Sequence, residues 1–371
     1  MRFKQLKALW TDERTQRALS EFKTLAKTQP KKLLIDTFTA CAAGKSFESN
    51  IVLGNPTFNE LGLHRFRVAL AAKLATRRRA VLAHCLSVED LAAFEQNGFI
   101  LKENYLSDAD FTALKQELLG QRLPTRETLQ GDTVTRRMAL DARTLPQLPQ
   151  TQKLLKSAHW QSLINYVGSF KVQPMYYVQV IISHVRKARP DPQTNLHSDT
   201  FHPSVKAWLF LNDVEADEGP FVYVPGSHQV TEKRLAWEYQ QSMQMSAKSE
   251  TMSRRGSLRI QAKDLALLGY AEPKAFAVKA NTLVIADTYG FHARGPSVRP
   301  STRIELWAYA RRSPFLPWVG GNLLGLPLLK DRLIPIYWWV ADYLEQQGKR
   351  KNPWRKVGAL FATDPTQLTQ K

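Results

Sequence analysis

The sequence contains very little cysteine: Cys41 and Cys85 are the only two in 371 residues. Two thiols are too few for a disulfide framework or for a zinc-thiolate cluster. No N-terminal run resembles a secretory signal. The composition therefore favours a protein of the reducing cytoplasm.

Long apolar runs suited to a membrane span are also missing. Residues 313–329 are uncharged, but this stretch contains three prolines and three glycines. Proline removes a backbone donor and breaks the interior of a helix, so a straight spanning helix is not expected there. Any membrane association would have to be peripheral.

Acidic residues are outnumbered: 33 Asp and Glu face 52 Lys and Arg, for a formal net charge of +19. A surface of this sign attracts anions, and nucleic acid, anionic lipid and acidic substrates all fit that description. Nucleic-acid binding is the least favoured of the three, because no recognition motif accompanies the charge. The hydrophobic content of 43% is ordinary for a globular protein.

Three regions follow one another along the chain. Residues 1–86 are expected to form a basic helical N-terminal extension, residues 87–311 a β-rich domain, and residues 312–371 an aromatic and basic C-terminal extension. Beyond about residue 172 the pattern predicts short strands separated by turn residues, at 175–184, 206–214, 221–224, 276–278, 282–286 and 303–310. The fold class is mainly β with helical flanks, either a sandwich or a jelly roll.

Two segments outside the β-rich domain have an open interpretation. In residues 61–85, Leu63, Phe66, Leu70, Leu74 and Val81 recur at helical spacing among arginines. This helix either packs its stripe on the core or lies on an anionic bilayer. The tryptophans and basic residues after 312 likewise suit a membrane interface or a segment that packs back on the core.

The segment 195–200 carries the most informative motif. In a strand, residues i and i+2 point to the same face, so His197 and Asp199 can offer an imidazole nitrogen and a carboxylate oxygen side by side. His292, which follows the apolar run 282–286, is the candidate for a third ligand. Two histidines and one carboxylate on one face leave positions open for a 2-oxo acid and O2, as an Fe(II) oxygenase requires.

A second candidate is Arg303, which lies eleven residues after His292 and opens a predicted strand. A 2-oxo acid that chelates iron at one end needs a partner for its far carboxylate. A guanidinium supplies two parallel hydrogen bonds in a geometry that lysine cannot copy. We therefore expect Arg303 to bind the far carboxylate of the cosubstrate.

The sequence resembles the phytanoyl-CoA dioxygenase family of Fe(II)/2-oxoglutarate oxygenases. The resemblance rests on His197-Ser198-Asp199, the runs 208–214 and 224–228, and His292 with Arg303 eleven residues later. It covers roughly residues 95 to 311. It implies a double-stranded β-helix (a jelly-roll, cupin-like core), Fe(II) on His197, Asp199 and His292, and the cosubstrates 2-oxoglutarate, bound by Arg303, and O2.

The resemblance also extends to finer expectations. Related halogenases lack the carboxylate, so Asp199 favours hydroxylation. Gln179, on the strand before the metal motif, is expected to contact the cosubstrate, whereas His228 is interpreted as a structural residue of a turn.

The substrate expectation is a lipid, glycolipid or acyl-type molecule, met by an enzyme peripheral on the inner, cytoplasmic face of an anionic membrane. A soluble small-molecule substrate is the alternative. A non-catalytic or nucleic-acid-binding relative is a weaker one, and we expect no nucleic-acid partner.

Overall fold

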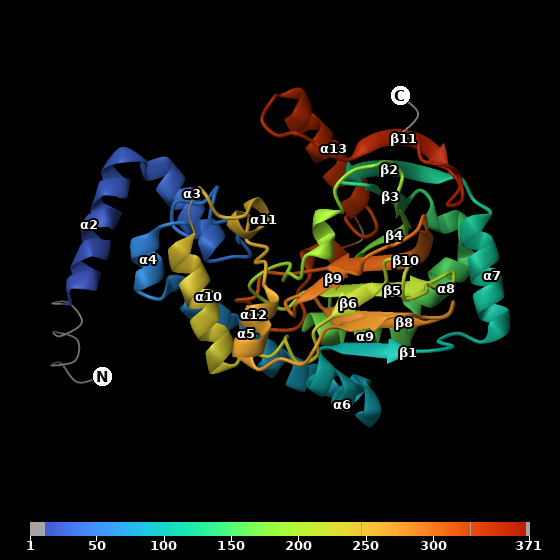
Figure 1. Cartoon of the computed structure of the whole chain (residues 1–371), viewed down its shortest axis with the longest axis horizontal. Coiled ribbons are helices and arrows are strands. Elements are labelled where there is room, and N and C mark those ends of the chain that lie inside the picture. The colour runs from blue at the N-terminus through green and yellow to red at the C-terminus, as the bar shows by residue number, and fades with distance from the viewer. Residues whose placement is uncertain (1–11, 246, 327, 369–371) are drawn as a thin grey trace.

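A computed structural model describes residues 12–245, 247–326 and 328–368. Its centre is an antiparallel sheet of eight strands in the order β1-β8-β5-β10-β4-β3-β2-β11 (Figure 1). The strands of this main sheet are β1 (Phe99–Lys102), β2 (Leu123–Gln130), β3 (Thr133–Leu140), β4 (Met175–Ile182), β5 (Val205–Phe210), β8 (Leu283–Asp287), β10 (Thr302–Ala310) and β11 (Arg355–Leu360).

A smaller sheet lies against the first and is ordered β7-β6-β9. It consists of β7 (Lys274–Phe276), β6 (Phe221–Tyr223) and β9 (His292–Arg294). An antiparallel bridge between His197 and His292 attaches the segment of the His-x-Asp motif to the edge strand β9. Two antiparallel sheets face to face confirm the predicted jelly-roll class.

Side chains that alternate along the central strands belong to two different hydrophobic cores. On β10, Ile304 and Leu306 belong to a cluster on the outer face of the main sheet. Trp307, with Tyr177 of β4 and Trp208 of β5, belongs to a second cluster between the two sheets. Because side chains of a strand alternate with a period of two, one face packs on helices while the other lines the space between the sheets.

Helices cover the outer face of the main sheet (Figure 1). They are α7 (Asp108–Leu119), α8 (Pro149–Lys156) and α9 (Ala158–Gly168), preceded in the chain by α6 (Val88–Asn97). Leu118 of α7, Leu154 of α8 and Leu163 of α9 are buried in the outer cluster. Ser107 caps α7 by accepting a hydrogen bond from the Asp110 amide, as its sequence predicts.

The N-terminal helices form a separate layer beside the sheets. They are α2 (Glu13–Thr28), α3 (Pro30–Ala40), α4 (Pro56–Glu60) and α5 (Leu63–Leu82). They pack with α10 (Glu232–Gln244), which together with α11 (Thr251–Arg254) and α12 (Ala262–Leu268) lies between β6 and β7 in the chain. The long polar stretch between β6 and β7 is thus built around helices.

The apolar stripe expected on α5 is buried only in part, since Leu74 is buried and Leu63 and Leu70 are half-buried. Phe66 and Val81 are exposed, whereas Arg67 and Arg78 are buried. The Arg78 guanidinium donates to the carbonyls of Ser169, Pro314 and Leu316. Arginine can be buried when backbone carbonyls satisfy its donors, so tertiary contacts overrode the hydrophobic pattern of the helix.

Four strands were missed by the sequence pattern: β2, β3, β9 and β11. Charged side chains explain the omission of β2 and β3, since Arg126, Glu127 and Arg136 are buried there in ion pairs and hydrogen bonds. Strand β11 pairs with β2 and follows α13 (Leu333–Gln346). Among the described residues, none of the helices combines the length and apolar character that crossing a bilayer requires.

Candidate metal centre and its pocket

Three side chains from two segments converge between the sheets. His197 and Asp199 belong to the segment before β5, and His292 begins β9. One donor atom from each of the three lies within 4.8 Å of the others. The Asp199 Oδ1 atom is 3.8 Å from His197 Nε2 and 3.7 Å from His292 Nε2. The structure therefore brings together all three predicted ligands.

Backbone carbonyls orient both imidazoles. His197 Nδ1 is 2.7 Å from the carbonyl oxygen of Asn195, and His292 Nδ1 is 3.0 Å from that of Gly290. An Nδ1–H that donates to a carbonyl leaves Nε2 as a lone-pair donor. The Nε2 atom of His292 is buried and has no hydrogen-bond partner among the described residues, which fits an atom that ligates a metal.

The electrostatic environment holds the three side chains in metal-binding protonation states. Burial lowers the pKa of His292 to about 4 and lowers the pKa of His197 well below its usual value. Burial alone would raise the pKa of Asp199, but Lys206 and the two imidazoles hold it well below its ordinary range. Two neutral imidazoles and a carboxylate are the donor set that suits Fe(II).

Two lysines that the sequence did not indicate contact the ligand Asp199. Lys206 Nζ is 2.6 Å from Asp199 Oδ2, and Lys45 Nζ donates to the backbone carbonyl of Asp199 at 2.5 Å. Burial lowers the pKa of Lys45 to about 8. Because Lys45 lies between α3 and α4, the N-terminal region reaches the metal centre directly.

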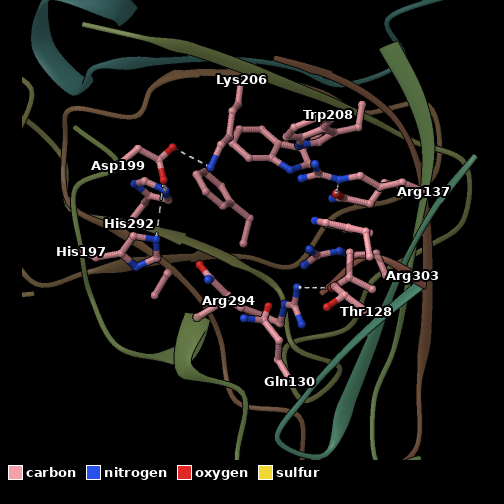
Figure 2. Close-up of a pocket in the computed structure, with 17 residues that line it drawn as sticks. Thr128, Gln130, Arg137, His197, Asp199, Lys206, Trp208, His292, Arg294 and Arg303 are labelled. Atoms are coloured by element: carbon pink, nitrogen blue, oxygen red, sulfur yellow. Dashed lines mark hydrogen bonds and ion pairs between the residues drawn. The ribbon is translucent and has the colours of Figure 1, made fainter. Parts of the chain in front are cut away.

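A cavity of about 260 Å³ adjoins the three ligands. Figure 2 shows the ligands on one side of it and Arg137 and Arg303 on the other. Among the described residues, four cationic side chains line this pocket, namely Arg137, Lys206, Arg294 and Arg303, whereas Asp199 is its one lining carboxylate. The pocket therefore suits anionic ligands.

Arg303 lines the pocket as predicted, but it already has partners. Its Nε atom is 2.9 Å from Glu305 Oε2, and its Nη1 donates to the Gly219 carbonyl at 2.6 Å. Residues 303 and 305 face the same side of β10, so the pairing follows from strand geometry. The role of Arg303 toward the far carboxylate of 2-oxoglutarate stays a prediction.

Gln179 also lines the pocket, and it connects Arg137 of the pocket to Glu305. Its Nε2 atom donates to Glu305 Oε1 at 2.6 Å, and its Oε1 atom accepts from Arg137 Nε at 3.3 Å. The predicted contact between Gln179 and the cosubstrate likewise stays a prediction. His228 is outside the group of three ligands and packs on Phe94, with 5.1 Å between ring centroids.

Arg294 and Arg137 are pocket residues that sequence reasoning missed. Arg294 lies two residues after His292 on β9, so the same strand argument that joined His197 to Asp199 would have found it. Its Nη1 is 2.5 Å from Asp191 Oδ2. Arg137 had no such signal, because the strand that carries it was not predicted.

The fold and this site define a metal-dependent oxygenase with a jelly-roll core. The model of the phytanoyl-CoA dioxygenase family matches residues 94–263, a range that contains His197 and Asp199. The match agrees with the predicted family over these residues, and the three-ligand site fits an Fe(II)- and 2-oxoglutarate-dependent oxygenase. His292 and Arg303 lie beyond the matched residues, so their assignment rests on the geometry above.

Solved structures show distant similarity. HygX from Streptomyces hygroscopicus, with nickel and 2-oxoglutarate bound, is 15% identical, with a TM-score of 0.39 over 61% of this chain and 87% of that one. The epimerase SnoN is 14% identical, with a TM-score of 0.40 over 76% and 96%. EctD from S. alaskensis is 16% identical, with a TM-score of 0.36 over 61% and 77%. No curated protein matches the chain.

Proposed function

We propose that the protein hydroxylates an unactivated C–H bond of a lipid, glycolipid or acyl-type molecule while it is bound to the cytoplasmic face of an anionic membrane. The observation that supports this most directly is an exposed apolar and aromatic face on α13, next to basic residues and to the pocket. The bound iron would supply oxidising power through O2 and 2-oxoglutarate, and the protein would supply orientation and shielding from water.

The apolar face of α13 is exposed to solvent. Trp339 is 66% exposed, and Ile336, Tyr337, Val340 and Tyr343 of the same helix are also large and exposed. Helix α13 projects away from the sheets in Figure 1. Aromatic side chains with an apolar body and a polar edge favour the boundary between water and lipid.

Basic residues follow this helix directly. The exposed cations after it are Lys349, Arg350, Lys351, Arg355 and Lys356. Each basic residue near an anionic bilayer contributes about 1 kcal/mol of attraction. Apolar insertion and electrostatic attraction would thus act on the same part of the molecule.

This surface is close to the pocket. Trp338 of α13 is buried and packs on Tyr177 of β4, with 6.2 Å between ring centroids. Trp354, which lies between α13 and β11, lines the pocket itself. A molecule held at the membrane would therefore meet the protein near the entrance to the pocket.

Sedimentation with vesicles tests the membrane part of the proposal. We expect the protein to pellet with vesicles rich in phosphatidylserine at low salt, and much less with neutral phosphatidylcholine vesicles or at high salt. Replacement of Trp339 and Tyr343 by Ser should reduce pelleting. Phe38→Ser on α3, where Phe38 is 74% exposed, is the matched control and should not. A protein that stays in the supernatant at low salt would refute membrane binding.

Release of succinate tests the chemistry separately. Incubation with 2-oxoglutarate and O2 should yield succinate only when Fe(II) is present. Mass spectrometry of lipid extracts treated with the protein should then show a product heavier by one oxygen atom.

A soluble small-molecule substrate is the second candidate. The polar side chains of the pocket support it, since Thr128, Gln130 and Gln193 line the cavity beside the arginines. An oxygenated product found in the aqueous fraction, and none in the organic fraction, would favour this alternative.

A further inference from the structure

We propose that Arg137 binds an anionic group of the organic substrate, a phosphate or a carboxylate, on the side of the pocket opposite the metal ligands. The inference rests on the proposed oxygenase function and specifies the chemical class of the substrate. It depends on which cationic side chains of the pocket have a carboxylate partner and which do not.

Aromatic rings frame the Arg137 guanidinium. Its Cζ atom is 4.3 Å from the ring centroid of Trp307, 4.6 Å from that of Trp354 and 5.3 Å from that of Tyr177. Rings of this kind attract a cation and fix the plane of a guanidinium. The N–H groups at the edge of that plane remain available to an oxyanion.

Arg137 differs from the neighbouring arginines in its partners. Arg294 is paired with Asp191, and Arg303 is paired with Glu305. Within the described residues, no carboxylate forms an ion pair with Arg137, whose Nε donates a hydrogen bond to the neutral amide of Gln179. Partial burial lowers the pKa of Arg137 and so disfavours its charged form.

The charges of the metal and the cosubstrate do not remove this excess. Lys206 is balanced by Asp199, Arg294 by Asp191 and Arg303 by Glu305. A divalent iron and a dianionic 2-oxoglutarate cancel each other. One positive charge is left at Arg137, and a half-buried charge without a partner is unfavourable unless a ligand supplies one.

The position of Arg137 suits a substrate anchor. Figure 2 shows it across the cavity from His197 and His292. An anion bound there would leave the rest of the molecule to extend toward the metal ligands. Trp354 contributes both to the frame of Arg137 and to the link with α13, so the charged group would enter from the side of the proposed membrane surface.

Calorimetry on the full chain tests the proposal. The protein is loaded with Fe(II) and 2-oxoglutarate under nitrogen and titrated with octyl phosphate, octanoate and inorganic phosphate. We expect at least one of the three anions to bind, and we expect Arg137→Gln to weaken that binding about tenfold or more, the usual effect of losing a charge-assisted hydrogen bond. Arg137→Lys keeps the charge without the planar fork, and its affinity for the anion should lie between those of wild type and Arg137→Gln.

Arg122→Gln is the matched control. Arg122 precedes β2 and lies over the ring of Phe361, at 4.5 Å from the centroid, but it does not line the pocket. Its loss should leave anion binding unchanged. Tighter binding of octyl phosphate than of inorganic phosphate would indicate a head group attached to a chain, and equal binding would indicate a small soluble anion; both support the role of Arg137.

Three results would overturn the proposal: wild-type protein that binds none of the anions, equal binding by Arg137→Gln, or a tenfold loss of 2-oxoglutarate affinity in that variant. The last would assign Arg137 to the cosubstrate instead. Failure of the oxygenase function itself is recognised separately, because wild-type protein would then release no succinate in the presence of Fe(II).

Discussion

Two regions of this protein bury several charged side chains, and they differ in how completely those charges cancel. One is the joint between α5 and α10. There the Glu238 carboxylate is 2.9 Å from His64 Nε2 and accepts from Arg234 Nε at 2.9 Å and from the Tyr289 hydroxyl at 2.8 Å. Arg234 and Glu238 are both 0% exposed.

The pocket is the other region, and its arginines and Lys206 outnumber the carboxylates around them. Both regions carry a desolvation cost, which is larger in the joint because its charges are fully buried. In the joint the cost is offset by partners within the chain, which makes it a structural device that ties two helices together. In the pocket part of the cost is left for a ligand to offset, which is typical of a binding site.

The largest expected effect comes from removing a metal ligand, because this change disrupts metal binding in the pocket. Asp199→Ala should weaken Fe(II) binding by more than about a hundredfold, because even partners outside the ligand shell are worth ten- to a hundredfold. Calorimetry under nitrogen measures the affinity, and succinate release should vanish in parallel. His84→Ala, at an exposed histidine, should behave as wild type; an Asp199→Ala protein that still binds Fe(II) normally would contradict the assignment.

A substitution in the joint between α5 and α10 should instead change the stability of the protein. Glu238→Gln leaves Arg234 without its carboxylate and should lower the free energy of unfolding by about 3 kcal/mol. Glu232→Gln, on the same helix but in an exposed pair with Arg65, should cost less than about 1 kcal/mol. Urea unfolding at neutral pH measures both. Equal losses of unfolding free energy in the two variants would show that the buried network stabilises the fold no more than the exposed ion pair does.

The same variant has a defined pH dependence. Burial would raise the pKa of Glu238, but Arg234, His64 and Tyr289 lower it from 4.5 to about 2. A folded-state pKa below the unfolded value means that the contribution is complete above pH 4.5 and is lost as the pH falls toward 2. The difference in stability between wild type and Glu238→Gln should therefore shrink over that range, and a constant difference would contradict the assignment.

The smallest expected effect comes from replacing one cationic side chain of the pocket, Arg303. Arg303→Gln should weaken 2-oxoglutarate binding by about ten- to a hundredfold, since it removes hydrogen bonds from a charged donor. Arg299→Gln, at an exposed arginine paired with Asp217, is the control. Unchanged affinity in Arg303→Gln would show that Glu305 occupies this arginine fully and that another cation binds the cosubstrate.

Much of the β-rich domain could be predicted from local pattern. The strands β4, β5, β6 and β8 lie where alternation and apolar runs indicated them. Strands β2 and β3 could not be predicted this way, because residues such as Glu127 and Arg136 are polar in sequence and become buried only as partners of each other.

The sequence by itself identified the three candidate metal ligands that the structure brings together. The i, i+2 spacing of His197 and Asp199 is a local property of an extended chain, and His292 follows a strand that its own apolar residues specify. Tertiary structure alone decided which face of α5 is buried, that Lys45 reaches Asp199, and that Arg137 is left without a carboxylate. These features depend on contacts between residues far apart in the chain, and no local pattern encodes which charges will meet a partner once the sheets have closed on each other.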